Sequence, residues 1–456
     1  MSVDSAGHQK SARAERSSNT DGEAGGAEGS GEARPVSQAA DDSGRADLLW
    51  QALTRENLAA AWKRVKANAG SAGSDGLTIR QTAEYLKAHW PTIKEQLFAG
   101  TYRPQPVRRV QIPKPDGGMR ELGIPAVTDR LRKPALLQVL QPLLDPGFSE
   151  HSYGFRPNRR ALDAICRAQQ YVQAGYRTVV DVDLEKFFDR VNHDVLVDRL
   201  GKRITDQAVW RLIRRYLQAG IMVHGVAQER YEGTPQGGPL SPLLANVLLD
   251  EVDRHLERCG HRFVRYADDC NVYVRSQRAG ERVMAALRKQ YARLRLKINE
   301  TKSTVASAFG RKFLGYSLWL APGGDVKRTV ALKAREAFKQ RVRRITKRNG
   351  GRSMVEVVAE LRGYLLGWRA YFRWAQTPTV MRELDEGLRH RLRALQLKQW
   401  RRGTTMYREL RALGASSEQA ARIAGSARRW WHNSRYEVNR VLPIGYFDRL
   451  GVPRLS

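Results

Sequence analysis

The sequence has few cysteines and no long apolar segment. Only three cysteines occur among 456 residues. They form no CxxC pair, so neither a zinc site of paired cysteines nor a disulfide framework is expected. The sequence also lacks the 18 or so consecutive apolar residues of a transmembrane helix, so no membrane span is expected. A reducing, cytoplasmic setting is consistent with these absences.

Acidic residues are scarce relative to basic ones. The chain has 79 Lys and Arg against 47 Asp and Glu, a formal net charge of +32. An excess of this size favours a polyanionic partner, and nucleic acid is the first expectation. An anionic membrane surface is the competing partner, but no isolated basic amphipathic helix beside a lipidation signal is present.

The charge is unevenly distributed along the chain. Residues 1–48 have almost no aliphatic or aromatic side chains and carry roughly four net negative charges, so we expect a disordered acidic tail. This tail has no apolar core of a secretory signal, and its acidic residues do not fit a transit peptide. Residues 327–402 are strongly basic, with 21 Lys and Arg against 6 Asp and Glu.

Hydrophobic periodicity predicts a mixed α/β part followed by a helical part. The expected helices cover residues 54–68, 80–98, 130–144, 159–174, much of 189–219, and 239–258. Strands are expected within 107–125, at 176–184, and in a hairpin around "RYADDCNVYV" (265–274). Beyond residue 320 the pattern is helical to about residue 402.

Two strand-like apolar segments carry aspartates. Asp181 and Asp183 lie two apart, on one face of the first segment, and Asp268 and Asp269 are adjacent in the second. Isolated carboxylates are costly in such surroundings, and clustered ones repel each other. A divalent cation such as Mg²⁺ removes both costs. The alternative is that each aspartate caps a turn or faces solvent.

Several sequence blocks occur in the order of a known family. "FVRYADDCNVYV" (263–274) is similar to the YADD motif of group II intron-encoded reverse transcriptases. "DVDLEKFFD" (181–189) resembles their first catalytic motif, and "EGTPQGGPLSPLLANVLLDEVD" (232–253) resembles their PQG motif. Further blocks that resemble the family are residues 102–130, 148–165, 296–303, 312–318, 360–374 and 391–402.

The resemblance implies the fold class and domain organisation. The fold would be an α/β (α+β) right-hand polymerase, with an antiparallel palm sheet and an α-helical thumb. The implied domains are the tail (1–48), fingers and palm (49–320), the thumb or maturase X domain (321–402), and a short C-terminal segment (403–456) that either contacts DNA or packs on the thumb. No HNH endonuclease is expected, because paired cysteines are absent and "WWHNSRYEVN" (430–439) lacks the required spacing.

The resemblance also implies a catalytic set. Asp183 and Asp268 would be the principal ligands of two Mg²⁺ ions, with Asp269 in support, whereas Asp181 is expected to be structural. Two such ions can activate an attacking hydroxyl and stabilise a departing pyrophosphate. Phe188 matches the aromatic steric gate that disfavours a ribose 2′-OH; its alternative role is that of a core phenylalanine.

Nucleotide contacts are implied at two further places. Lys114 and Arg120 would grip the triphosphate from the arms of a hairpin, and Lys302 would protonate pyrophosphate. The alternative is that Lys114 and Arg120 are ordinary surface charges. Gln236 and Gly237 would approach the template and the incoming base closely, since glycine lets the backbone come near a ligand.

The basic segment after residue 326 is expected to bind intron RNA. Ten cations against one glutamate in residues 327–348 favour a surface that follows phosphates. Aromatic residues at helical spacing, from Tyr364 to Phe372, are expected to pack between helices rather than to stack on bases. The implied RNA-binding residues are Lys339, Arg341, Arg343, Arg344, Lys347 and Arg348.

One block departs from the family pattern. "DRLRKPAL" (129–136) has Lys133 and Pro134 in what is usually a helix interior. A proline there removes a backbone hydrogen bond. Either the helix begins at Pro134, or the fingers are altered.

Together, these features predict an RNA-directed DNA polymerase that is also a maturase. Its partners would be intron RNA, an RNA template, a DNA primer or target, and dNTPs, in the bacterial cytoplasm or nucleoid, with the oligomeric state open. It would copy the intron RNA into cDNA during retrohoming. The alternatives are a domesticated relative, in phage defence or beside a CRISPR system, and an RNA-binding maturase without polymerase activity.

Overall fold

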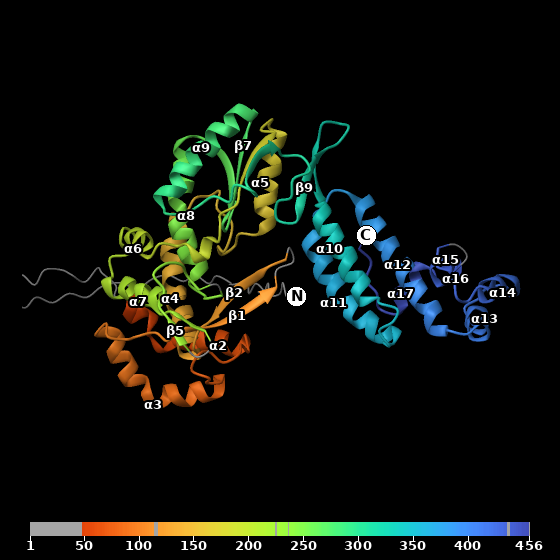
Figure 1. Cartoon of the computed structure of the whole chain (residues 1–456), viewed down its shortest axis with the longest axis horizontal. Helices are drawn as coiled ribbons and strands as arrows, with labels where there is room; N and C mark the ends of the chain where they lie inside the picture. Colours follow the sequence, from red (N-terminus) through yellow and green to blue (C-terminus); the bar gives the residue numbers. More distant parts are fainter. Residues whose placement is uncertain (1–47, 114–116, 224–225, 236, 436–437, 456) are drawn as a thin grey trace, which may run out of the picture. The chain divides into compact units, whose positions relative to one another are not determined.

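The computed structural model describes residues 48–113, 117–223, 226–235, 237–435 and 438–455 (Figure 1). Its chain order is the expected one, a mixed α/β part followed by a helical part. The α+β prediction is therefore confirmed.

Within the described residues, three helices precede the first strand: α1 (Leu48–Ala52), α2 (Arg55–Ala67) and α3 (Ile79–Phe98). Thr54 caps α2, because the Asn57 backbone N–H donates to its hydroxyl at 3.4 Å. Thr78 and Gln81 form a reciprocal capping box at the start of α3. Polar side chains therefore set both helix starts, as the sequence predicts for α2.

The first sheet has the strand order β2-β1-β4-β5. β1 and β2 form the predicted antiparallel hairpin, whereas β1 and β4 pair in parallel over two residues. The sequence did not predict the parallel pair. Its strands are β1 (Val107–Pro113), β2 (Met119–Ile124), β4 (Ile221–Val223) and β5 (Val226–Gln228).

Helix α4 (Val127–Leu144) continues without interruption past Pro134 and Pro142. The expectation that a helix begins at Pro134 is therefore wrong. Lys133 is buried, with its ammonium group 4.7 Å from the centre of the Tyr216 ring. This cation–π contact gives the substituted lysine a partner in the protein interior.

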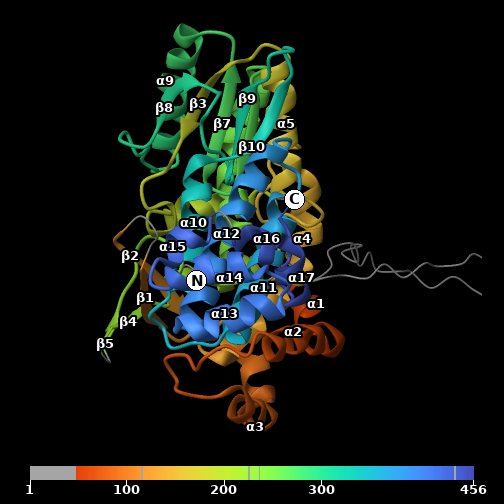
Figure 2. The same ribbon diagram turned by 90° about the vertical axis from the view of Figure 1, so that its right-hand side faces the viewer.

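The second sheet has the order β6-β7-β3-β8, and every neighbouring pair is antiparallel. This matches the predicted palm sheet. One face packs on α5 through Val179, and the other packs on α9 through Val180. Figure 2 shows α5 and α9 on opposite sides of these strands. The elements are α5 (Ala161–Gln173), β3 (Thr178–Val182), β6 (Arg262–Tyr266), β7 (Asp269–Val274), α9 (Gln277–Arg293) and β8 (Thr304–Ser307).

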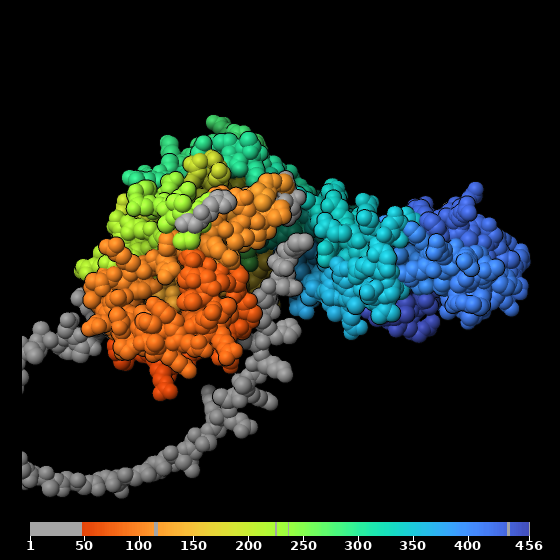
Figure 3. Space-filling model, turned by 60° about the horizontal axis from the view of Figure 1, so that its bottom comes forward, coloured from red at the N-terminus to blue at the C-terminus, as the bar shows by residue number. Residues whose placement is uncertain are grey.

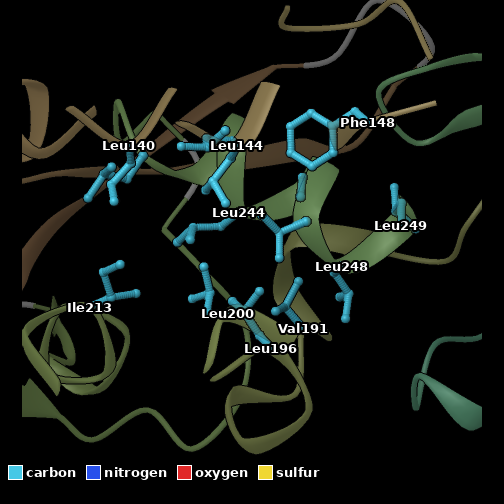
Figure 4. Packing of buried hydrophobic residues seen from close by; sticks show 14 of the residues in the cluster. Leu140, Leu144, Phe148, Val191, Leu196, Leu200, Ile213, Leu244, Leu248 and Leu249 are labelled. Carbon is cyan, nitrogen blue, oxygen red and sulfur yellow. The ribbon is translucent and has the colours of Figure 1, made fainter. Parts of the chain in front are cut away.

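The largest apolar cluster includes side chains of the palm sheet, such as Val180 and Val272. Leucines of α4, α6 and α8 meet in it (Figure 4), among them Leu144, Leu196 and Leu248. Burial of these side chains fixes the helices that carry the strands of the site. Its helices are α6 (His193–Gly201), α7 (Gln207–Gln218) and α8 (Ser241–Arg258).

A two-stranded hairpin leads into the helical part. The sequence predicted helix from residue 321 onward, so β10 was missed; its five residues alternate too briefly to reveal a strand. Ile165 of α5 belongs to the apolar cluster of the helical part. The elements are β9 (Tyr316–Leu320), β10 (Val326–Val330), α10 (Leu332–Ile345), α11 (Met354–Phe372) and α12 (Pro378–Trp400).

Five short helices follow α12, and their buried side chains share one apolar cluster with α10 to α12. In the space-filling view, α10 to α17 form one continuous mass, coloured cyan to blue (Figure 3). The division at residue 402 stays a prediction. The short helices are α13 (Gly403–Ala412), α14 (Ser417–Gly425), α15 (Trp430–Asn433), α16 (Val438–Val441) and α17 (Ile444–Arg449).

Candidate active site

The two acidic segments meet at the end of the palm sheet. β3 pairs with β7 so that Asp181 lies opposite Asn271. The pairing ends one position later, at Val182 and Cys270, so Asp183 directly follows the last pair on β3 and Asp269 directly precedes it on β7. β6 and β7 pair up to Tyr266 and Asp269, which leaves Ala267 and Asp268 as a two-residue turn. The sheet therefore brings together the carboxylates that the sequence predicted to converge.

The loop that leads into β8 holds Asp183 in place. The Asp183 backbone N–H donates to Ser303 Oγ at 2.9 Å, and its carbonyl accepts from the Asn299 N–H at 2.8 Å. Lys302 Nζ lies 3.8 Å from Asp183 Oδ2. The predicted lysine thus stands directly beside the predicted metal ligand.

The carboxylates of this site repel one another. Loss of surrounding water, reinforced by the negative charges of Asp268, Asp183 and Asp181, raises the pKa of Asp269 to about 7. Burial, with the nearby Asp183, also raises the pKa of Asp268. Such shifts mark a site that gains free energy from an added cation or proton.

Cationic side chains reach the acidic cluster from other elements. Arg120 of β2 lies close enough to the turn to oppose the rise in the pKa of Asp268. Lys312 likewise opposes the rise in the pKa of Asp269. The sequence predicted Arg120 at this site but did not single out Lys312. Lys114, the other predicted triphosphate contact, lies outside the described residues.

Asp181 already has protein partners. The Arg311 guanidinium donates two hydrogen bonds to Asp181 Oδ2, at 3.0 and 3.2 Å. With its amide turned to satisfy both neighbours, Asn271 donates to Asp181 Oδ1 at 2.9 Å. These contacts occupy the carboxylate, which is consistent with the expected structural role.

A buried ion pair supports the turn that carries Asp268. Arg265 and Asp253 are both fully buried, and the guanidinium donates to both carboxylate oxygens at 2.5 to 3.0 Å. Arg265 Nη1 also donates to the carbonyl of Ala267 and to Asn246 Oδ1, each at 2.9 Å. The ion pair is thus bonded directly to the backbone of the turn.

Gly154 completes this support. Asn246 Nδ2 donates to the Gly154 carbonyl at 2.9 Å, and a Cβ at this position would overlap the backbone of Ala267. Ala267 itself has a left-handed φ of 59°. The sequence analysis missed Arg265, Asp253, Asn246 and Gly154 as site residues. An arginine within an apolar strand was the only available signal, and its partners lie in distant segments.

The PQG segment lies against the predicted steric gate. Phe188 is half-buried in the short helix η2 (Phe187–Asp189), with its ring 5.0 Å from that of Phe187. Its carbonyl accepts from the Thr234 N–H at 2.7 Å. Gly237 has a φ of 97°, which favours glycine. Gln236 lies outside the described residues.

The carboxylates of this site fit a hard divalent cation. Among the described residues, however, no three His, Cys, Asp or Glu side chains are already arranged to hold a metal ion. Asp183, Asp268 and Asp269 offer only oxygen atoms, and their mutual repulsion is the cost that a cation would relieve. Mg²⁺ needs only one or two carboxylates when water and phosphate oxygens complete its shell.

The predicted RNA-binding cations lie on α10 and the loop after it. Lys339, Arg343 and Arg344 are exposed on α10, and Lys347 and Arg348 are exposed beyond it. Arg341 is an exception, because it donates to Glu360 of α11 at 3.0 Å and links the two helices.

The aromatic residues of α11 are mainly packing residues. Trp368 and Phe372 are buried, with ring centres 4.5 Å apart, and Phe338 lies 4.7 Å from Trp368. Tyr371 is more exposed, yet its hydroxyl donates to the Leu314 carbonyl. This agrees with the expected packing role.

Two family models match different parts of the chain. Residues 112–318 match "Reverse transcriptase (RNA-dependent DNA polymerase)", and residues 335–414 match "Group II intron, maturase-specific domain". The first match contains Asp181, Asp183, Asp268 and Asp269. The second covers α10 to α12 and the start of the short C-terminal helices.

Curated relatives agree with these matches. The chain is 35% identical over 225 residues to "Protein YkfC" of Escherichia coli, which covers 48% of this chain. It is 27% identical over 355 residues to "Group II intron-encoded protein LtrA" of Lactococcus lactis, which covers 63% of this chain. The chain spans 59% of the length of each of these relatives.

Among solved structures, a chain of the "Partial Cas6-RT-Cas1--Cas2 complex" aligns with a TM-score of 0.36 and 26% identity. The alignment covers 54% of this chain and 43% of that chain. No helix in the described part of the chain has both the length and the apolar character needed to cross a bilayer. In this order along the chain, the two matches make it similar to group II intron-type reverse transcriptases that carry a maturase-specific domain.

Proposed function

We propose that this protein is an RNA-directed DNA polymerase, which extends a DNA primer on an RNA template. The observation that carries the proposal is the meeting of Asp183 with Asp268 and Asp269 across the β3–β7 pair. Two Mg²⁺ ions held by these carboxylates would supply Lewis-acid stabilisation of the phosphoryl group.

The chain's own residues position the reactants around that site. Arg120 and Lys302 are the cations nearest the carboxylates among the predicted contacts, and they would bind the triphosphate of a dNTP. Lys302, beside Asp183, would also donate a proton to the departing pyrophosphate. Phe188, held by Thr234, would exclude a ribose 2′-OH.

The maturase-specific match supports a second role in the same protein. The exposed cations of α10 and the following loop would bind phosphates of intron RNA and stabilise its fold, while the RNA carries out the splicing chemistry. The domesticated alternative has the same catalytic residues. A group II intron RNA encoded around the gene would support the intron role over the domesticated one.

Primer extension by the purified protein tests the polymerase. A DNA primer annealed to RNA is incubated with dNTPs and Mg²⁺, and full-length cDNA is the expected product. The variant Asp268→Asn should make no full-length cDNA. Its matched control is Asp325→Asn, which changes an exposed aspartate in the β9–β10 turn. Absence of cDNA from both wild type and control, with intron RNA still bound, would favour the maturase without polymerase activity.

A further inference from the structure

The outer face of α9 carries an uncompensated row of cations. Arg278, Arg282, Lys289 and Arg293 occur at positions i, i+4, i+11 and i+15 of the helix and are all exposed. With 3.6 residues per turn, these positions fall within an arc of about 60°. They therefore form one straight stripe, about 22 Å long at 1.5 Å per residue. We call this set the α9 stripe.

Acidic side chains do not neutralise the α9 stripe. Within the described residues, none of its four cations forms an ion pair. The nearest basic neighbour on the helix, Arg288, is different, because it pairs with Glu300 through two hydrogen bonds of 2.9 and 2.7 Å. Glu281, the acidic residue of α9, accepts a bond from Gln277 instead.

The positive surface continues beyond α9. Partial burial, together with the neighbouring cations Arg258 and Arg293, lowers the pKa of His255. Arg258 is exposed at the end of α8. The end of α8 and the end of α9 thus contribute cations to one patch, where each unpaired charge repels the others until an anion binds.

The opposite face of α9 fixes the stripe rigidly on the palm. Val283, Met284, Leu287 and Tyr291 are buried in the main apolar cluster. Gly280 lets the helix approach the sheet closely, since a Cβ there would collide with Val305. α9 is therefore a fixed scaffold for its exposed cations.

The α9 stripe lies on the side of the palm sheet away from the catalytic carboxylates. Asp181 and Asp183 share the β3 face that carries Val179 and packs on α5, whereas α9 covers the face that carries Val180. A primer–template duplex bound at the carboxylates would therefore lie on the side of the sheet opposite α9. The stripe is thus a separate surface.

We propose that the α9 stripe is a second RNA-binding surface, which holds the phosphates of a structured RNA while the catalytic cleft holds primer and template. A straight row of Arg and Lys suits a helical phosphate backbone. A membrane surface fits poorly, because an interfacial helix needs a free apolar face and that of α9 is buried in the protein core. The inference rests on the proposed function for its RNA partner.

Two variants with unchanged buried residues test the proposal. R278Q/R282Q/K289Q/R293Q removes the four charges, whereas R278K/R282K/K289R/R293K keeps them and serves as the matched control. Each protein is first loaded with a primer–template whose primer is chain-terminated. Binding of a labelled, closed RNA hairpin is then measured over a range of salt concentrations, and primer extension is measured separately.

The loaded wild type should bind the hairpin, and the glutamine variant should bind it about tenfold more weakly or worse. The slope of log affinity against log salt should become shallower by about 3, since four phosphate contacts are lost. The charge-retaining variant should bind within about twofold of the wild type. Both variants should extend primers at the wild-type rate.

Three results would overturn the inference. They are equal hairpin binding by the glutamine variant, failure of the loaded wild type to bind the hairpin, and stripe-dependent binding of phosphatidylglycerol vesicles without stripe-dependent RNA binding. If the wild type makes no cDNA but its hairpin binding depends on the stripe, only the polymerase proposal fails.

Discussion

Gly154 and Ala267 are in such close backbone contact that a Cβ on the glycine would overlap the turn carrying Asp268. The contact joins a loop before α5 to the hairpin of β6 and β7. Because Asp268 follows Ala267 directly, the position of a predicted metal ligand depends on a residue with no side chain.

Gly154→Ala should therefore slow primer extension. The added methyl group must displace the turn, and a misplacement of about 1 Å at a catalytic group can cost about a hundredfold in rate. Single-turnover extension rates check this. Gly201→Ala is the control, because nothing lies within 4 Å of a Cβ there. A normal rate for the Gly154 variant would mean that the turn tolerates the shift.

Asp268→Asn should abolish DNA synthesis while intron RNA binding remains. Loss of a metal ligand removes several kcal/mol of charge stabilisation, which lowers the rate by about a hundredfold to a thousandfold. Primer extension and RNA filter binding measure the two functions in one preparation. Loss of both together would argue against separable functions, provided that the variant is folded.

Asp253→Asn should destabilise the protein by about 3–5 kcal/mol, because it leaves the Arg265 charge buried without its partner. Urea unfolding measures the loss. Asp198→Asn is the matched control; its carboxylate is exposed and pairs with Lys202 at 3.0 Å, so the loss should be at most about 1 kcal/mol. Equal losses in both variants would contradict a special role for the buried pair.

The metal-free protein should become less stable as pH rises from the ordinary aspartate value of 3.8 to about 7. In this window the folded protein still holds a proton on Asp269 that the unfolded chain has lost, so each rise in pH favours unfolding. Thermal unfolding with a chelator checks the sign. Mg²⁺ should reduce the dependence, since the cation replaces the proton.

The variant Asp269→Asn provides the control for this pH effect. It should show a weaker dependence than the wild type in the same window, with the remainder due to Asp268 and Asp181, whose pKa values are also raised. A stability that rises with pH in the metal-free wild type would contradict the repulsion described for this site.

Phe188→Ala should increase incorporation of ribonucleotides, because the smaller side chain leaves room for a 2′-OH. The ratio of kcat/KM for dNTP and rNTP measures the change. Phe188→Tyr keeps the bulk of the ring and should preserve the discrimination. If the alanine variant loses stability without losing discrimination, Phe188 is a core residue, which its packing on Phe187 would also allow.

The convergence of the carboxylates could be predicted from the sequence. Asp183 and the 268–269 pair each lie in an apolar, strand-like stretch of the sequence, and such a pattern is costly unless the acids meet around a cation. The helices were also predictable where a polar cap and an apolar stripe coincide, as at Thr54. In these cases the signal lies within a single segment.

The features that the sequence did not predict depend on contacts between distant segments. The parallel pairing of β1 with β4 involves short strands more than a hundred residues apart. Arg265, Asp253 and Asn246 form one network only after α8 packs under β6. In the sequence, Lys133 was an unexplained departure from the family pattern. Its burial is explained by its contact with the Tyr216 ring of α7.

Helix α5 belongs to two apolar clusters at once. Ala168 and Val172 pack on the palm sheet, whereas Ile165 packs with the helical part. Gln169 and Gln173 also bond to the backbone of Val326 in β10. A truncation after residue 318, where the first family match ends, would thus expose the side chain of Ile165 and leave the amides of Gln169 and Gln173 without their partner Val326. The two parts should therefore be expressed together to remain in solution.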